Sequence, residues 1–268
     1  MTDLGQIAVL GLIAGGIYAL FAVGVVLVYR GTGSLNFALG EVGTFSAYVA
    51  WKIITEWDLP WLLGAAAAVA TGAVIGIVFE RLVVRPMVDA NRLSVAVGTV
   101  GLLLFLIAFE FKVFTGSPRP LAGPITGTGI EMFGVFVSPT QILALIVAAA
   151  IGLGLGAFLK RTDFGLGVLA ASQDASATRL VGVPLARVTS FVWGTAGAVS
   201  AVAALLIVPT IGDVTPGFAS RLFVFGLAAA IVGGLTSLQG AFVGGVVVGL
   251  WEEIAKRTLS DTGVFGVE

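Results

Sequence analysis

The residue best suited to chemistry in this chain is Glu41, because it lies within an apolar segment, 34–55, that is long enough to cross a membrane. Asn36 and Thr44 accompany it, and on a helix Phe37, Glu41 and Thr44 would share one face. An ionisable group at membrane depth is costly and is a functional candidate by default. Two interpretations fit: the strip lines a path for a polar solute, or Glu41 lies near the inner interface and accepts hydrogen bonds from helix N-terminal amides.

Three further side chains are candidates for lining such a path. Tyr18, in GGIYAL, offers a hydroxyl, Thr99, in VGTVG, offers a small polar group, and Phe218 follows Pro216-Gly217, where an outer gate would lie. Each also has a simple structural interpretation. Tyr18 would seal a helix contact, Thr99 would pack between helices, and Phe218 would be an interfacial aromatic.

The other charged residues near apolar segments are expected at the membrane surfaces. Glu110 and Lys112 lie at the outer end of the segment 93–114, where we expect them to extend toward the interface. Arg81 and Arg85 are expected to anchor the inner interface.

Several chemistries are excluded by composition, since the chain contains neither cysteine nor histidine. Thiolate catalysis, disulfides, zinc sites of the usual ligands and Ser-His-Asp triads are therefore absent, and we assign no catalytic or metal-binding residue. The 14 basic and 15 acidic residues form no basic stripe, which argues against a nucleic-acid partner. A phosphate-binding loop needs Gly-Lys-Ser/Thr, but the four lysines follow Trp, Phe, Leu and Ala. Any ATP hydrolysis must come from another polypeptide.

The elements that position these residues are membrane-spanning helices. Of the 268 residues, 58% are apolar and only 11% are charged, whereas a soluble domain is about 25% charged. A span needs about 20 apolar residues. We predict an all-α polytopic membrane bundle, a single domain over 1–268, with about eight spans (seven to nine) and broken or re-entrant segments. The predicted spans are 4–29, 34–55, 59–80, 93–114, 138–159, 187–209, 215–235 and 239–256.

The distribution of lysine and arginine predicts the orientation, because short cytoplasmic loops concentrate these residues. One group lies at 81–92 and another at 160–187, and two helices separate them, so both face the cytoplasm and the N-terminus lies outside. Eight full spans would place Lys256 and Arg257 outside as well. Either the charge rule is broken there, or one C-terminal segment is re-entrant.

Two stretches resemble interrupted helices. Residues 31–41 combine three glycines with an Asn and a Glu, and 233–245 contains five glycines around a short polar break. Broken helices at membrane depth are tolerated where they line a cavity, and they occur at matching places in many transporters. The alternative is that both stretches are ordinary interfacial turns.

The most informative polar segment is the cytoplasmic loop 160–187, because 28 residues are far more than a connection requires. The pattern predicts two short helices. Asp174 would cap a turn at about 175–181, and Gly182 followed by Pro184 would end it. A short helix parallel to the membrane would suit docking of a motor subunit, and a solvated helix without a partner is the alternative.

Four passages together carry a resemblance to a known family. They are GLIAGGIYALFAVGVVLVYRGTGSLNFALGEVGTFSAY (11–48), ERLVVRPM (80–87), KRTDFGLGVLAASQDASATRLVGV (160–183) and GLAAAIVGGLTSLQGAFVGGVVVGLWE (226–252). In this order they resemble the permease subunits of the branched-chain amino-acid class of ABC importers, the LivH type.

The resemblance implies a transmembrane permease subunit in a bacterial inner membrane, with a second related permease, two ATP-binding subunits, an extracytoplasmic solute-binding protein and membrane lipid as partners. ATP and Mg would be bound by the ATPases, with no cofactor on this chain. The loop 160–187 would contain the coupling helix. Its contact residues would be Asp174, Ala175, Ala177, Thr178, Arg179, Leu180 and Gly182.

The resemblance suggests branched-chain amino acids as substrates, but related permeases handle amides, urea and other organic acids, and no residue here discriminates among them. From the residues alone, an ion-coupled secondary transporter is the main alternative, and a membrane scaffold without a conduction path is another. The ion-coupled alternative needs a midplane acid or ion site, for which Glu41 is the candidate.

Overall fold

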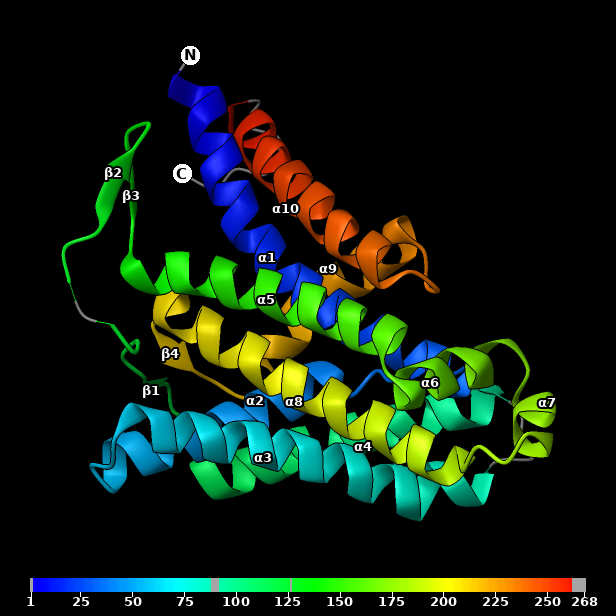
Figure 1. Cartoon of the computed structure of the whole chain (residues 1–268). Helices are drawn as coiled ribbons and strands as arrows, with labels where there is room; N and C mark the ends of the chain where they lie inside the picture. Colours follow the sequence, from blue (N-terminus) through cyan, green and yellow to red (C-terminus); the bar gives the residue numbers. More distant parts are fainter. Residues whose placement is uncertain (1, 88–91, 126, 262–268) are drawn as a thin grey trace.

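The computed structural model describes residues 2–87, 92–125 and 127–261, and it confirms the predicted all-α membrane bundle (Figure 1). Six helices of the described part are long and apolar enough to cross a membrane. They are α1 (Thr2–Thr32), α3 (Trp61–Phe79), α4 (Arg92–Phe114), α5 (Pro139–Arg161), α8 (Leu185–Ile211) and α10 (Leu238–Asp261). Two shorter helices, α2 (Leu39–Trp51) and α9 (Phe218–Gly233), complete the eight predicted segments.

Short elements occupy the two ends of the bundle. At one end lie α6 (Asp163–Gln173) and α7 (Ala175–Leu180), and at the other lie four short strands (Figure 1). Strands β1 (Arg119–Pro120) and β4 (Asp213–Val214) form an antiparallel pair, and β2 (Ile130–Met132) pairs with β3 (Val135–Val137) in a hairpin. Further helical turns extend α2 (Lys52–Glu56, π) and α3 (Glu80–Val84, π; Arg85–Met87, 3-10).

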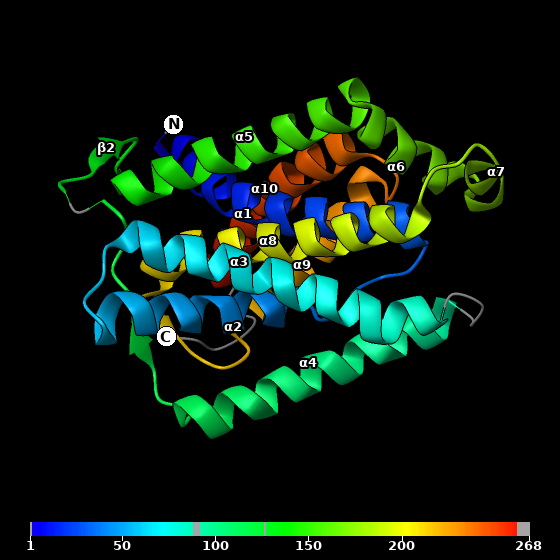
Figure 2. The same cartoon turned by 60° about the horizontal axis from the view of Figure 1, so that its bottom comes forward.

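Helices α1 and α8 form the centre of the bundle. In each of them 78% of the most apolar stretch is buried, whereas the corresponding fraction in α3, α4, α5 and α10 is 17–28%. Helix α4 lies at the margin in Figure 2. The peripheral helices therefore present apolar surface to lipid or to a partner.

Glycines allow the central helices to approach closely. A Cβ on Gly72 of α3 would collide with the backbone of Gly197 in α8, and one on Gly245 of α10 would collide with the backbone of Ala19 in α1. Small residues at such crossings are the usual packing device of membrane helices, because they allow van der Waals contact between backbones.

The first predicted break, 31–41, is present, and it moves the start of the second helix. Gly33 adopts a positive φ of 67° and ends α1, and the amide oxygen of Asn36 accepts a hydrogen bond from the Ala38 N–H (3.0 Å). The prediction that 34–55 is helical throughout was therefore wrong over its first turn, and α2 begins at Leu39.

Helices α2 and α9 both begin inside the bundle. The hydroxyl of Ser200, near the middle of α8, donates a hydrogen bond to the Leu39 carbonyl. A Cβ on Gly40 would collide with the Cα of Ser220 and the carbonyl of Ala219, so the starts of α2 and α9 cross in direct contact. Glycine is required at position 40 for this approach.

The second predicted break, 233–245, is an ordinary turn, so the interpretation as an interrupted helix was wrong there. Gly234 has a φ of 92°, and α10 begins four residues later with the Ser237 hydroxyl accepting from the Gly240 N–H (2.9 Å). The interruption lies earlier, at 212–217, between α8 and α9.

The start of α1 and the end of α10 lie on the same side of the bundle. Arg257 donates from Nη2 to Oε1 of Gln6 (3.1 Å), which places the end of α10 beside the start of α1. Lys256 pairs with Glu252 (2.8 Å) and Arg257 with Glu253 (3.4 Å). Helix α10 therefore crosses the bundle fully and is not re-entrant, and Lys256 and Arg257 lie at the same end as the start of α1.

Candidate functional site

The central feature of the bundle interior is the start of α9, which side chains of α2 hold by hydrogen bonds. The Gly217 N–H donates to Oε1 of Glu41 (3.0 Å), and the Ser220 hydroxyl donates to Oε2. The Ala219 N–H donates to the Thr44 hydroxyl (3.2 Å). A helix start leaves unpaired N–H groups and carries partial positive charge, so a carboxylate there is stabilising. Glu41 thus accepts a hydrogen bond from a backbone amide at a helix start, as expected. The helix is α9, however, and the contact lies in the bundle interior rather than near the inner interface.

The loop before α2 is held in the same region. The Phe37 N–H donates to the Thr99 hydroxyl of α4 (3.0 Å), and that hydroxyl donates to the Ala96 carbonyl (2.6 Å). Asn36, Glu41, Thr44 and Thr99 are all at most 3% exposed. The expected helical strip of Phe37, Glu41 and Thr44 is not formed, because Phe37 precedes the helix.

The structure gathers most of the predicted path residues around the starts of α2 and α9. The gathered residues are Asn36, Phe37, Glu41, Thr44, Thr99 and Phe218. Tyr18 lies apart: its ring stacks on Phe225 of α9 (centroids 5.0 Å apart), and its hydroxyl donates to Oε2 of Glu252 (2.5 Å).

Glu110 was predicted to extend toward the interface, and this prediction was wrong. Its side chain is fully buried, facing the Glu41 carboxyl and the Gly217 backbone, whereas Lys112 is exposed. One signal was available in the sequence. Glu110 follows Thr99 by 11 residues, three helical turns, so both residues lie on one face of α4.

Arg221 is a charged residue that the sequence reading missed. It lies one turn into α9, a helix that starts inside the bundle, and its side chain is exposed. No ion pair to Arg221 is formed within the described ranges. Since an arginine at membrane depth faces water or a partner rather than lipid, this face of α9 is a candidate for contact with a polar medium.

The far end of the bundle presents the predicted short helices. Asp174 accepts from the Ala177 N–H (2.9 Å) at the start of α7, and Gly182 has a φ of 85° just after its end. Thr178 faces inward, but Leu180 and Val181 are 89% and 77% exposed. Two adjacent apolar side chains so exposed on a polar loop form a surface suited to a protein partner.

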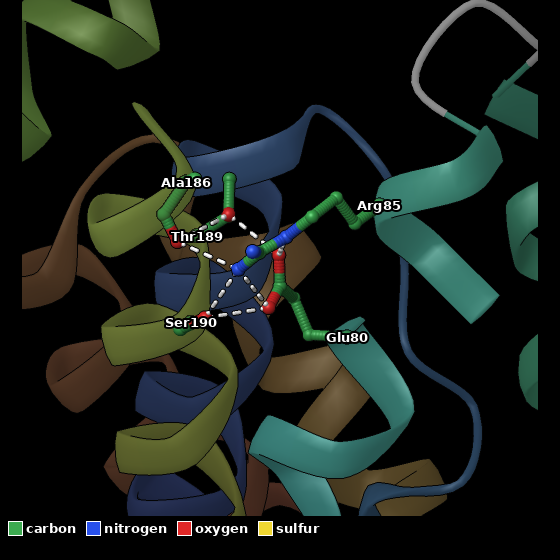
Figure 3. Close-up of polar contacts among 5 residues, drawn as sticks. All are labelled: Glu80, Arg85, Ala186, Thr189 and Ser190. Atoms are coloured by element: carbon green, nitrogen blue, oxygen red, sulfur yellow. Dashed lines mark hydrogen bonds and ion pairs between the residues drawn. The ribbon is translucent and has the colours of Figure 1, made fainter. Parts of the chain in front are cut away.

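A buried carboxylate fastens the end of α3 to the start of α8 (Figure 3). Glu80, 1% exposed, accepts from Arg85 Nε (3.1 Å) and Nη2 (2.9 Å), from the Thr189 hydroxyl (2.7 Å) and from the Ser190 hydroxyl (2.6 Å). Arg85 also donates to the Ala186 carbonyl (3.0 Å). Because α8 directly follows the loop that contains α7, this cluster connects the exposed helix to the bundle.

The described residues contain no group of three or more acidic, His or Cys side chains placed to hold a metal ion. The fold and the interior site define a multi-pass helical membrane protein in which two helices begin inside the bundle, an arrangement found in transport proteins.

The comparisons identify the family. Residues 7–262 match the model of the permease component of branched-chain amino acid transport systems, and the chain belongs to this family. It is a transmembrane permease subunit. No solved structure matches it.

Curated relatives align over nearly the full chain. Identity is 30% to the high-affinity branched-chain amino acid permease protein BraD of Pseudomonas aeruginosa, over 94% of this chain and 86% of the relative. Identity to the permease protein LivH of Escherichia coli K12 is also 30%, over 93% of this chain and 85% of the relative. The ribose import permease RbsC of E. coli is 26% identical over 83% of this chain and 67% of the relative.

Proposed function

We propose that this permease subunit forms part of the translocation path of an ATP-driven importer for branched-chain or related amino acids. Family membership and the names of its relatives support this substrate class. The ion-coupled alternative has no support from the relatives.

The observation that carries the ATP-driven mechanism is the end of α7, where Leu180 and the next residue, Val181, are exposed at one end of the bundle. An apolar pair on a capped helix provides a fixed surface for a soluble partner. We propose that α7 docks an ATP-binding subunit, with Asp174 and Gly182 fixing the two helix ends. The complete transporter then comprises two permease subunits, two ATPases and a solute-binding protein. ATP and Mg bind to the ATPases, and the chain itself holds no cofactor and catalyses no reaction.

The proposed orientation places α6 and α7 in the cytoplasm and both chain ends outside, in a bacterial plasma (inner) membrane. The concentration of lysine and arginine at 81–92 and 160–187 supports it. In this orientation Lys256 and Arg257 are exceptions to the charge rule, each paired with an acid one turn earlier on α10.

We propose that the exposed face of α9 lines the path, with Arg221 as the contact for the carboxylate of a passing amino acid. A carboxylate and a guanidinium form two parallel charge-assisted hydrogen bonds. The buried residues Glu41, Thr44 and Thr99 then act as positioning residues that hold α9 and the adjoining loop. Tyr18, stacked on Phe225, lies beside the same helix.

The decisive experiment is uptake into proteoliposomes that contain this chain with its partner subunits. Import of a branched-chain amino acid should require internal ATP and should persist when an uncoupler removes the ion gradients. Uptake by this chain without ATPases, abolished by the uncoupler, would contradict the proposal.

A further inference from the structure

Helix α4 contacts the bundle along a single buried stripe that contains one carboxyl group. The stripe consists of Val95, Thr99, Leu106, Glu110 and Phe114. Glu110 is fully buried, and neither of its carboxyl oxygens has a hydrogen-bond partner among the residues described. A buried polar group without a partner is expensive, so this carboxyl requires an explanation.

The groups that face Glu110 are mainly acidic or neutral. They are the Glu41 carboxyl and the Gly217 backbone at the start of α9, and the Tyr48 hydroxyl of α2. The guanidinium of Arg119 also faces Tyr48. Within the described part of the chain, Arg119 forms no ion pair with Glu110.

Arg119 is held by other groups. Its guanidinium lies over the ring of Trp51 (4.7 Å to the centroid), and Nη2 donates to the Phe114 carbonyl (3.4 Å). The arginine therefore does not neutralise the acid pair by direct contact.

Two facing carboxylates that are both fully buried cannot both be ionised without large repulsion. A metal cation would need several oxygen ligands. Both oxygens of Glu41 already accept hydrogen bonds from Gly217 and Ser220, and no third acidic side chain joins the pair in the described residues. One proton removes the repulsion between the two carboxylates. It also gives Glu110 a hydrogen-bond partner, because a protonated carboxyl donates to a carboxylate.

We propose that Glu41 and Glu110 form a single-proton site, with the proton on Glu110 and its O–H donating to Glu41. Glu41 already accepts from two donors, the Gly217 N–H and the Ser220 hydroxyl, whereas neither Glu110 oxygen has a partner in the described chain, so the proton is assigned to Glu110. This proton ties α4 to the starts of α2 and α9. Its loss places two like charges between these elements and weakens the contact of α4 with the bundle.

Infrared spectroscopy of the full chain in lipid tests the site directly. At neutral pH the wild-type chain should show the C=O band of a protonated carboxylic acid, and this band should disappear in Glu110→Gln. Glu56→Gln, a change at an exposed acid, should leave it unchanged. Absence of the band in the wild type, or its survival in Glu110→Gln, would overturn the proposal. Absence combined with stabilisation by Na⁺ or K⁺ would instead indicate a bound cation.

Cysteine labelling tests whether loss of the proton weakens the contact of α4 with the bundle. Only the introduced cysteine is labelled, because the chain has no cysteine of its own. Leu106→Cys lies one turn before Glu110 on the buried stripe, and Val113→Cys is an exposed control (4% and 47% exposed). At alkaline pH, labelling at 106 relative to 113 should rise about tenfold. The rise should vanish when Glu110→Gln is added, since the amide still donates to Glu41 and cannot ionise. An equal rise in both backgrounds would refute the link between the proton and α4.

Neither readout depends on transport. A failure of the proposed import activity therefore leaves this test unaffected, and the reverse also holds.

Discussion

Replacing Glu80 by alanine should destabilise the chain strongly, because four hydrogen bonds converge on this buried carboxylate. Bonds to charged groups contribute about 1.5–3 kcal/mol each. The estimate must be reduced, since Thr189 keeps a contact with the Ala186 carbonyl (3.3 Å) and the Arg85 side chain is 41% exposed and can rehydrate. We expect a net loss of about 3 kcal/mol in the free energy of unfolding, which is about a 100-fold change in the unfolding equilibrium.

The chain offers a matched control. Glu56 forms an ion pair with Lys52 (3.5 Å), but both side chains are 44% exposed. Such surface pairs contribute about 0.5 kcal/mol or less, so Glu56→Ala should be nearly neutral. Glu80→Gln should fall between the two, because one acceptor oxygen remains.

The assay is reversible unfolding in mixed micelles, followed by tryptophan fluorescence. Trp193 is a suitable probe, as it is fully buried and its ring lies 5.7 Å from that of Phe79, the residue before Glu80. If Glu80→Ala and Glu56→Ala lose the same stability, the reasoning is refuted. The reasoning is also refuted if Arg85→Ala lowers the free energy of unfolding equally in the wild type and in Glu80→Ala, because the effects of coupled residues are not additive.

Three further outcomes are expected. Leu180→Arg should abolish association with the ATP-binding subunits and ATP-driven uptake while the chain remains folded. Leu180→Ala should retain part of both. Unchanged co-purification of Leu180→Arg with the ATP-binding subunits would contradict docking at α7. Gly40→Val should reduce the yield of folded protein sharply, because the new side chain meets the backbone of α9. Gly154→Val should be tolerated, because no atom lies within 4 Å of a Cβ there. Equal yields of the two variants would argue against the close crossing of α2 and α9. Arg221→Gln should raise the KM for uptake about tenfold and Arg221→Lys should raise it less, and an unchanged KM in Arg221→Gln would exclude the carboxylate contact.

Local signals predicted the parts of the fold that depend on neighbours in sequence. The long charge-free stretches identified the membrane helices, and Asp174 with Gly182 located both ends of α7 within one residue. These predictions succeeded because solvation of a segment and capping of a helix are decided by residues within a few positions.

The glycines and polar residues of 31–41 predicted the break before α2. They did not predict how far inside the bundle this break lies. The same kind of composition at 233–245 was an ordinary turn. Glycine content alone does not distinguish the two, since the difference depends on what the loop packs against.

By itself, the sequence determined that this is a membrane protein and that a capped helix lies in its longest loop. Only the tertiary structure showed that Glu41 holds the start of α9, 176 positions away, and that Glu110 faces the same carboxyl. The physical reason is that burial and partnership of a charge are set by the crossing of distant helices. Spacing along one helix gives the face on which an acid lies, but not the group that it meets.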